Sequence, residues 1–127
     1  MVKVLYVEDE PLQRELVNQL LQLAGIEIQL AESGLEGVEK ARQWEPDVIL
    51  MDIRMPGLNG FDTIEQIRQI PSVADTPVVV LSAWATAQHT ARARALGVEW
   101  YITKPFNLDD LVSTIMDAYA ARADSKH

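Results

Sequence analysis

The sequence contains no cysteine. Neither a disulfide framework nor a thiolate metal site can form, and oxidising compartments are neither required nor excluded. The chain has 127 residues, 48% of them hydrophobic, which is enough to form a hydrophobic core without disulfides or a structural metal. We therefore expect one domain over residues 1–122, followed by a short C-terminal tail at 123–127.

Positive charge and long apolar runs are also scarce. Lys and Arg total 11 against 19 Asp and Glu, which gives a formal net charge of -8. An acidic domain is poorly suited to neutralising phosphates, so direct binding of nucleic acid is not expected. No basic segment precedes a long apolar run, and we predict neither a signal peptide nor a membrane span. A cytoplasmic location is the resulting expectation.

The sequence alternates between two kinds of segment. Short runs rich in branched apolar residues predict five strands, at 2–7, 26–30, 48–51, 78–81 and 98–102. Between them, apolar residues recur at helical spacing. Strict alternation of strand and helix implies right-handed crossovers, and hence a mainly parallel sheet with helices on both faces.

The predicted helices differ in what they offer for burial. Apolar stripes mark three of them: Leu12, Leu16, Leu20 and Leu23; Phe61, Ile64 and Ile67; Leu108, Leu111, Val112, Ile115 and Tyr119. Start and stop signals accompany the helices: Pro11, Ser33 with Glu36, Asn107, Gly25 and Gly97. The segment 86–96 has mainly Ala87, Ala91, Ala95 and Leu96. Small side chains make few apolar contacts, which favours a mobile helix. The alternative is an ordinary stable helix, because alanine is the best helix former.

Polar residues follow four of the five predicted strands. They are Glu8-Asp9-Glu10, Asp52, Ser82 and Lys104. Singly, each has an ordinary explanation as a cap, a turn or a surface charge. A parallel sheet, however, brings all four strand ends to one edge, where doubly wound folds bind their ligands.

The chemistry of these residues suits phosphoryl transfer. Converging acidic side chains repel each other unless a pKa rises or a cation binds, and oxygen ligands without His or Cys favour Mg²⁺. A carboxylate such as Asp52 can attack phosphorus, provided that the charge on the transferring oxygens is neutralised. Lys104 offers a positive charge and Ser82 a hydroxyl donor.

Three segments together resemble the receiver domains of two-component response regulators, related to the chemotaxis receiver. They are Val-Leu-Tyr-Val-Glu-Asp-Glu at 4–10, Met-Asp-Ile-Arg-Met-Pro-Gly at 51–57 and Lys-Pro-Phe at 104–106. The resemblance implies a flavodoxin-like α/β fold, a doubly wound five-stranded parallel sheet in order 2-1-3-4-5 with five flanking helices. It also implies a phosphorylation-dependent signalling switch that catalyses only its own phosphorylation and dephosphorylation.

The resemblance assigns roles at a magnesium site. Asp52 matches the phosphoacceptor. Glu8 and Asp9 match the acidic pair, with Asp9 the direct ligand and Glu8 acting through water. The backbone carbonyl of Arg54 matches the remaining ligand that the protein supplies to Mg²⁺.

The resemblance to receiver domains also assigns switch residues. Ser82 and Tyr101 match the pair that rearranges on phosphorylation, and Lys104 matches the phosphate-binding lysine, whose bond to Pro105 resembles the family's cis peptide. Arg54 and Trp84 match positions that border the route of attacking water. The implied partners are a histidine kinase or histidine phosphotransfer protein and a downstream protein at the Trp84/Tyr101 face. A phosphorylation-dependent dimer is left open.

Two other functions compete with this interpretation. One is an Mg²⁺-dependent phosphatase with an aspartate nucleophile, but Asp52-Ile53-Arg54 lacks the second carboxylate of such enzymes. The other is a receiver-like interaction module that needs no phosphorylation. Only residues 120–127 follow the last helical stripe, so we expect no effector in this chain, which is either a stand-alone receiver or part of a longer regulator.

Overall fold

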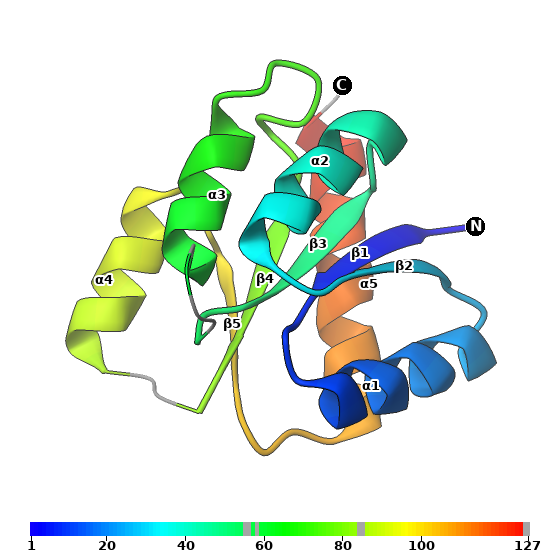
Figure 1. Cartoon of the computed structure of the whole chain (residues 1–127). Helices are drawn as coiled ribbons and strands as arrows, with labels where there is room; N and C mark the ends of the chain where they lie inside the picture. The colour runs from blue at the N-terminus through cyan, green and yellow to red at the C-terminus, as the bar shows by residue number, and fades with distance from the viewer. Residues whose placement is uncertain (55–56, 58, 84–85, 126–127) are drawn as a thin grey trace.

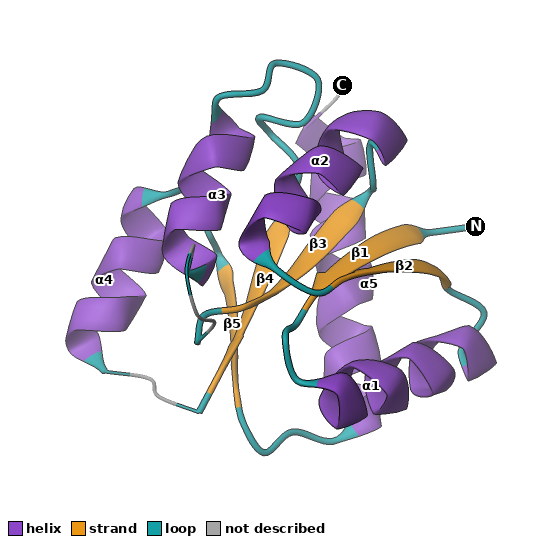
Figure 2. Cartoon of the chain, in the orientation of Figure 1, coloured by secondary structure: helices purple, strands orange, loops and turns teal. Residues whose placement is uncertain are grey.

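A computed structural model of the chain describes residues 1–54, 57, 59–83 and 86–125. It shows a three-layer α/β fold in which strands and helices alternate (Figures 1 and 2). The strands are β1 Lys3–Val7, β2 Glu27–Ala31, β3 Val48–Asp52, β4 Val78–Ser82 and β5 Trp100–Thr103. The helices are α1 Pro11–Leu23, α2 Gly34–Trp44, α3 Gly60–Arg68, α4 Ala87–Ala95 and α5 Leu108–Ser125.

The sheet has the order β2-β1-β3-β4-β5, and every pair of neighbouring strands is parallel. The fold class and strand order are therefore confirmed. Strand side chains alternate between two apolar layers, one packed against α2, α3 and α4 and the other against α1 and α5. The order reverses between β1 and β3, which places the ligand-binding edge beside the carboxyl ends of these two strands.

The strand boundaries lie within two residues of the predicted ones. The largest difference is at β5, which begins at Trp100 instead of at 98. The amide of Val98 donates to the carbonyl of Ala93 at 3.0 Å. Val98 therefore completes the turn that ends α4 and is not available to extend the strand.

The apolar stripe predicted for α1 was wrong. Three of its four leucines are exposed: Leu12 at 81%, Leu16 at 54% and Leu23 at 84%. Val17 and Leu21 are buried instead, and the guanidinium of Arg14 donates to the carbonyls of Glu8 and Asp9 at 2.9 and 3.3 Å. Spacings of three and four residues put Arg14, Val17 and Leu21 on one helical face. The contacts of Arg14 with the end of β1 thus fix which side of α1 faces the sheet.

The residues expected to bury α4 were also wrong. Ala87, Ala91 and Ala95 are exposed and Leu96 is half-buried, whereas Ala93 is the buried residue of this nine-residue helix. Contacts with α3 set this orientation, as described below. The stripes predicted for α3 and α5 do face the two apolar layers.

The predicted helix ends are confirmed. Ser33 accepts from the amide of Glu36 and Asn107 from the amide of Asp110, at 3.2 and 2.7 Å. Gly25 and Gly97 have φ of 81° and 79°, the left-handed region that ends helices without strain at glycine. Within the part of the chain that the structure describes, no helix is both long and apolar enough to cross a membrane.

The side chain of Arg68 joins three segments of backbone. Its guanidinium donates to the carbonyls of Ala74 and Thr76, before β4, and of Leu96, at the end of α4, at 3.0, 2.6 and 3.0 Å. Burial lowers its pKa, but three carbonyl acceptors satisfy the buried donors. The C-terminal end of α4 is thereby tied to α3 and to the loop before β4.

Candidate functional site

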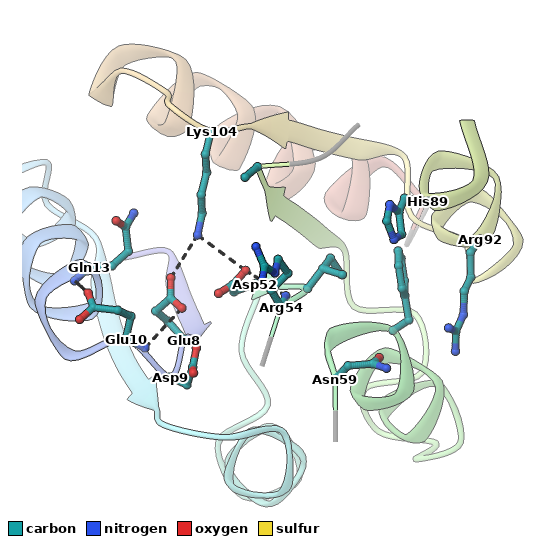
Figure 3. A pocket seen from close by; sticks show the side chains of 13 residues that line it. Glu8, Asp9, Glu10, Gln13, Asp52, Arg54, Asn59, His89, Arg92 and Lys104 are labelled. Carbon is teal, nitrogen blue, oxygen red and sulfur yellow. Dashed lines mark hydrogen bonds and ion pairs between the residues drawn. The ribbon is translucent and has the colours of Figure 1, made fainter. Parts of the chain in front are cut away.

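A cleft of about 750 Å³ opens at the carboxyl edge of the sheet. Residues after β1 and β3 line one side of it, and residues from α3 and α4 line the other (Figure 3). The cleft lies where the strand order reverses, the place that the topology favours for a ligand.

Three carboxylates meet in this cleft. Glu8, Asp9 and Asp52 each offer an oxygen within 4.8 Å of the others, and Glu8 and Asp52 are only 1% and 5% exposed. Asp52 is the last residue of β3, and its Oδ1 accepts from the amide of Arg54 at 3.2 Å. A Cβ at Gly60 would lie 2.5 Å from the carbonyl oxygen of Asp52, so only glycine lets α3 begin this close to the site.

The clustered carboxylates change each other's ionisation. Burial, followed by the neighbouring Asp52, raises the pKa of Glu8 to about 7, while Lys104 opposes that rise. Burial and the charge of Glu8 raise the pKa of Asp9 above its usual range. The site therefore favours a bound cation, which would relieve the repulsion.

Lys104 brings a positive charge from beyond β5 into the acidic cluster. Its Nζ lies 3.3 Å from Glu8 Oε1 and 3.6 Å from Asp52 Oδ1. The peptide bond between Lys104 and Pro105 is cis, and the Lys104 amide donates to the carbonyl of Ser82 at 2.8 Å. The lysine thus links the ends of β1 and β3 across the cleft.

The other predicted residues lie at the edge of this cluster. Ser82 ends β4 and is 2% exposed, and its neighbour Ala83 lines the cleft. Tyr101 is half-buried in β5 and packs on the apolar layer covered by α2, α3 and α4. Trp84 lies outside the described residues.

The sequence analysis did not assign four residues to the surroundings of the site. Phe61, at the start of α3, packs against two residues of α4: the centroid of the His89 ring lies 5.8 Å from that of Phe61, and the Arg92 guanidinium lies 5.0 Å from the Phe61 centroid. The fourth, Tyr6, donates its hydroxyl to Glu8 Oε1 at 3.1 Å. Its position two residues before Glu8, and hence on the same strand face, was the available signal.

The donor set fits a hard cation. Three carboxylates approach one another, and the chain has no cysteine. Carboxylate and carbonyl oxygens with water are the ligands that Mg²⁺ takes in proteins, usually with only one or two carboxylates binding directly. Glu8, Asp9 and Asp52 are the residues that could hold such an ion.

Together, the fold and the cleft define a doubly wound α/β domain with an acidic site at its carboxyl edge. Residues 4–116 match the response regulator receiver domain. The chain belongs to the response regulator receiver family, whose members are signalling proteins of two-component systems and not conventional enzymes. Members of this family act with histidine kinases and downstream effectors.

Similar proteins differ in length and in what their names describe. The chain is 35% identical over 115 residues to Protein PilH of Pseudomonas aeruginosa, covering 91% of this chain and 95% of that protein. It is 31% identical to the DNA-binding dual master transcriptional regulator RpaA of Synechocystis, again over 91% of this chain but only 48% of RpaA. The chain thus spans about half of RpaA.

Solved structures show the same fold. Chemotaxis protein CheY4 of Vibrio cholerae superposes with a TM-score of 0.89 at 32% identity, covering 93% of this chain and 98% of that one. The receiver domain of sensor histidine kinase PA1611 from Pseudomonas aeruginosa gives a TM-score of 0.86 at 27% identity, covering 94% and 98%. That structure has a magnesium ion coordinated in its active site cleft.

Proposed function

We propose that this chain is a phosphorylation-dependent switch in which Asp52 accepts a phosphoryl group from a histidine kinase or histidine phosphotransfer protein. The single observation that carries the proposal is the position of Asp52. Its carboxylate lies in the open cleft, in reach of two further carboxylates and 3.6 Å from the Lys104 ammonium.

The proposed step exchanges one bond to phosphorus for another. A carboxylate oxygen of Asp52 forms a bond to phosphorus while the bond between phosphorus and the donor's histidine nitrogen breaks. Lys104, which bridges Asp52 and Glu8 in this structure, would stabilise the negative charge on the phosphoryl oxygens.

We further propose that Asp9 holds Mg²⁺ together with Asp52 and the backbone carbonyl of Arg54, with Glu8 acting through water. The bound ion supplies charge neutralisation at the transferring oxygens. The oxygen-only donor set supports this proposal, as does the magnesium ion in the related PA1611 receiver.

The switch follows from the same residues. A phosphoryl group on Asp52 would draw Ser82 and Lys104 toward it, and Tyr101 would change its rotamer. A surface that includes Tyr101 and α4 would then bind the downstream partner. Pull-down with and without phosphorylation tests that surface, because a partner that binds equally in both states would contradict a switch.

The test of the phosphoacceptor is labelling by a small phosphodonor such as phosphoramidate. With Mg²⁺ present, we expect about one phosphoryl group per chain in the wild type and none in Asp52→Asn. The matched control is Asp117→Asn on the exposed side of α5, which should label like the wild type. Removal of Mg²⁺ with a chelator should abolish labelling. Equal labelling of the wild type and Asp52→Asn would overturn the assignment.

A further inference from the structure

A tyrosine hydroxyl lies beneath the site and has no part in the transfer step above. Tyr6 is fully buried in the apolar layer against α1 and α5. A hydroxyl in such surroundings is unfavourable unless it is hydrogen-bonded. Its acceptor is Glu8 Oε1, 3.1 Å away. Glu8 follows β1 directly, and a spacing of two residues in an extended chain puts its side chain on the same side of the sheet as that of Tyr6.

The two oxygens of Glu8 have unequal surroundings. Oε1 accepts from the Tyr6 hydroxyl at 3.1 Å and from Lys104 Nζ at 3.3 Å. Oε2 has the longer contact with the amide of Glu10, at 3.5 Å. Two donors on Oε1 therefore fix the plane of the carboxylate, which also contacts the carboxyl groups of Asp52 and Asp9. Figure 3 shows the Lys104 ammonium reaching toward both Glu8 and Asp52, with Asp9 on the far side of Glu8.

The two donors to Glu8 differ in whether they also interact with another acceptor. Lys104 is shared with Asp52, and a phosphoryl group on Asp52 would compete for it. The Tyr6 side chain is fully buried, and its ring packs in the apolar layer against α1 and α5. We expect its hydroxyl to stay on Oε1 when Lys104 turns toward a phosphoryl group.

We propose that Tyr6 is a positioning residue that sets the affinity of the site for Mg²⁺ by holding the carboxylate of Glu8 in one orientation. This inference rests on the proposed function. Groups that hydrogen-bond to a metal ligand commonly change metal affinity about 10- to 100-fold. Because Glu8 is proposed to reach the ion through water, we expect an effect at the lower end, about 10-fold.

The experiment compares Tyr6→Phe with Tyr119→Phe. Both substitutions remove only a hydroxyl, and both rings pack on the same apolar layer, but Tyr119 lies on α5 and away from Glu8. The apparent Kd for Mg²⁺ is taken from the rise in Tm with Mg²⁺ concentration. Tyr6→Phe should weaken Mg²⁺ binding about 10-fold, and Tyr119→Phe should leave it unchanged.

A second pair of variants separates positioning from a general loss of stability. Adding Tyr6→Phe to Glu8→Gln should not weaken Mg²⁺ binding further, because the hydroxyl acts through the Glu8 carboxylate. Labelling of Tyr6→Phe should recover the wild-type rate at saturating Mg²⁺. A variant that melts earlier but keeps the wild-type Kd would show a purely structural hydroxyl and overturn the proposal.

The outcomes also separate this proposal from the function on which it rests. If the wild type binds Mg²⁺ and labels on Asp52 while Tyr6→Phe has the same Kd, the role of Tyr6 is wrong and the function stands. If the wild type itself shows no Mg²⁺-dependent shift in Tm, both the Tyr6 proposal and the magnesium site are overturned.

Discussion

Helices α2 and α4 cover the same face of the sheet but are held there by different forces. α2 buries Gly34, Gly37, Val38 and Ala41. At Gly37 the helix approaches so closely that an added Cβ would lie 2.8 Å from Val7 Cγ2. α4 has one buried residue, Ala93, among its nine. Further contacts of α4 include the packing of His89 and Arg92 on Phe61, the Arg92–Asp62 ion pair at 2.9 Å and the bond from Arg68 to Leu96.

The difference indicates which part of the site can move. Disrupting a closely packed apolar interface costs a large free energy. By contrast, a partly exposed ion pair contributes about 0.2–1 kcal/mol and an exposed cation–π contact about 0.5–1 kcal/mol. Helix α2 packs on β1, and the acidic pair Glu8 and Asp9 directly follows that strand. The α4 side follows β4, which ends in Ser82. Glu8 and Asp9 are therefore on the rigid side, and the proposed switch serine ends the strand that precedes the weakly held helix.

The largest effect should come from a matched pair of leucine truncations. Leu5, fully buried in β1, packs in the layer under α2, and Leu96, at the end of α4, is only half-buried at the same layer. We expect Leu5→Ala to lower the free energy of unfolding by about 2–5 kcal/mol, and Leu96→Ala by about 1 kcal/mol. Urea denaturation measures both. Equal losses would contradict the contrast between the two sides.

A pH titration tests the rigid acidic side. The pKa of Glu8 is raised from 4.5 to about 7, so between these values the folded protein holds a proton that the unfolded chain has released. Without Mg²⁺, the free energy of unfolding should fall as pH rises through this window. At 1.36 kcal/mol per pKa unit, the upper limit is about 3 kcal/mol.

Controls for this titration come from the same carboxylate. Glu8→Gln should flatten the slope between pH 4.5 and about 7, whereas Glu36→Gln, on α2 and away from the cleft, should keep it. Saturating Mg²⁺ should also flatten the slope, because the ion favours ionised carboxylates. A slope unchanged in Glu8→Gln would show that another group is responsible.

The smallest effect on global stability should come from loosening α4. Arg92→Gln removes the ion pair with Asp62 and the contact with Phe61, at about 1 kcal/mol or less. Locally, amide hydrogen exchange in α4 should accelerate several-fold. The control is Arg42→Gln, which breaks the exposed pair with Glu39 on α2 at 2.8 Å. If exchange in α2 rose as much as in α4, the two helices would be equally well held.

Local sequence was sufficient for the sheet and for the clustering of acids. Apolar runs such as 48–51 are typical of strands buried on both faces, and a parallel sheet necessarily brings the residues after β1 and β3 to one edge. The proximity of Glu8, Asp9 and Asp52 follows from this geometry. Their roles in metal binding and phosphoryl transfer stay predictions.

The failures all depend on contacts between distant segments. In α1, apolar residues occur on two faces, and the buried face is the one with Val17, Leu21 and Arg14, which donates to the carbonyls of Glu8 and Asp9. In α4, the spacing of the alanines cannot predict that His89 stacks on Phe61, because Phe61 lies about 28 residues earlier in the chain. Helix periodicity describes a helix by itself, whereas its rotation is set by its neighbours.

The bond from Arg68 to Leu96 also defines the geometry of any tilt of α4. With its last turn fixed to the backbone before β4, the helix has a pivot at one end, far from Asp52, and its first turn beside the cleft. A nine-residue helix is roughly 13 Å long, so a rotation of about 10° around that pivot would carry the first turn through about 2 Å. A change at Ser82 and Lys104 would thus reach the outside of the molecule as a shift of the first turn of α4, the part of this helix that lies beside the cleft.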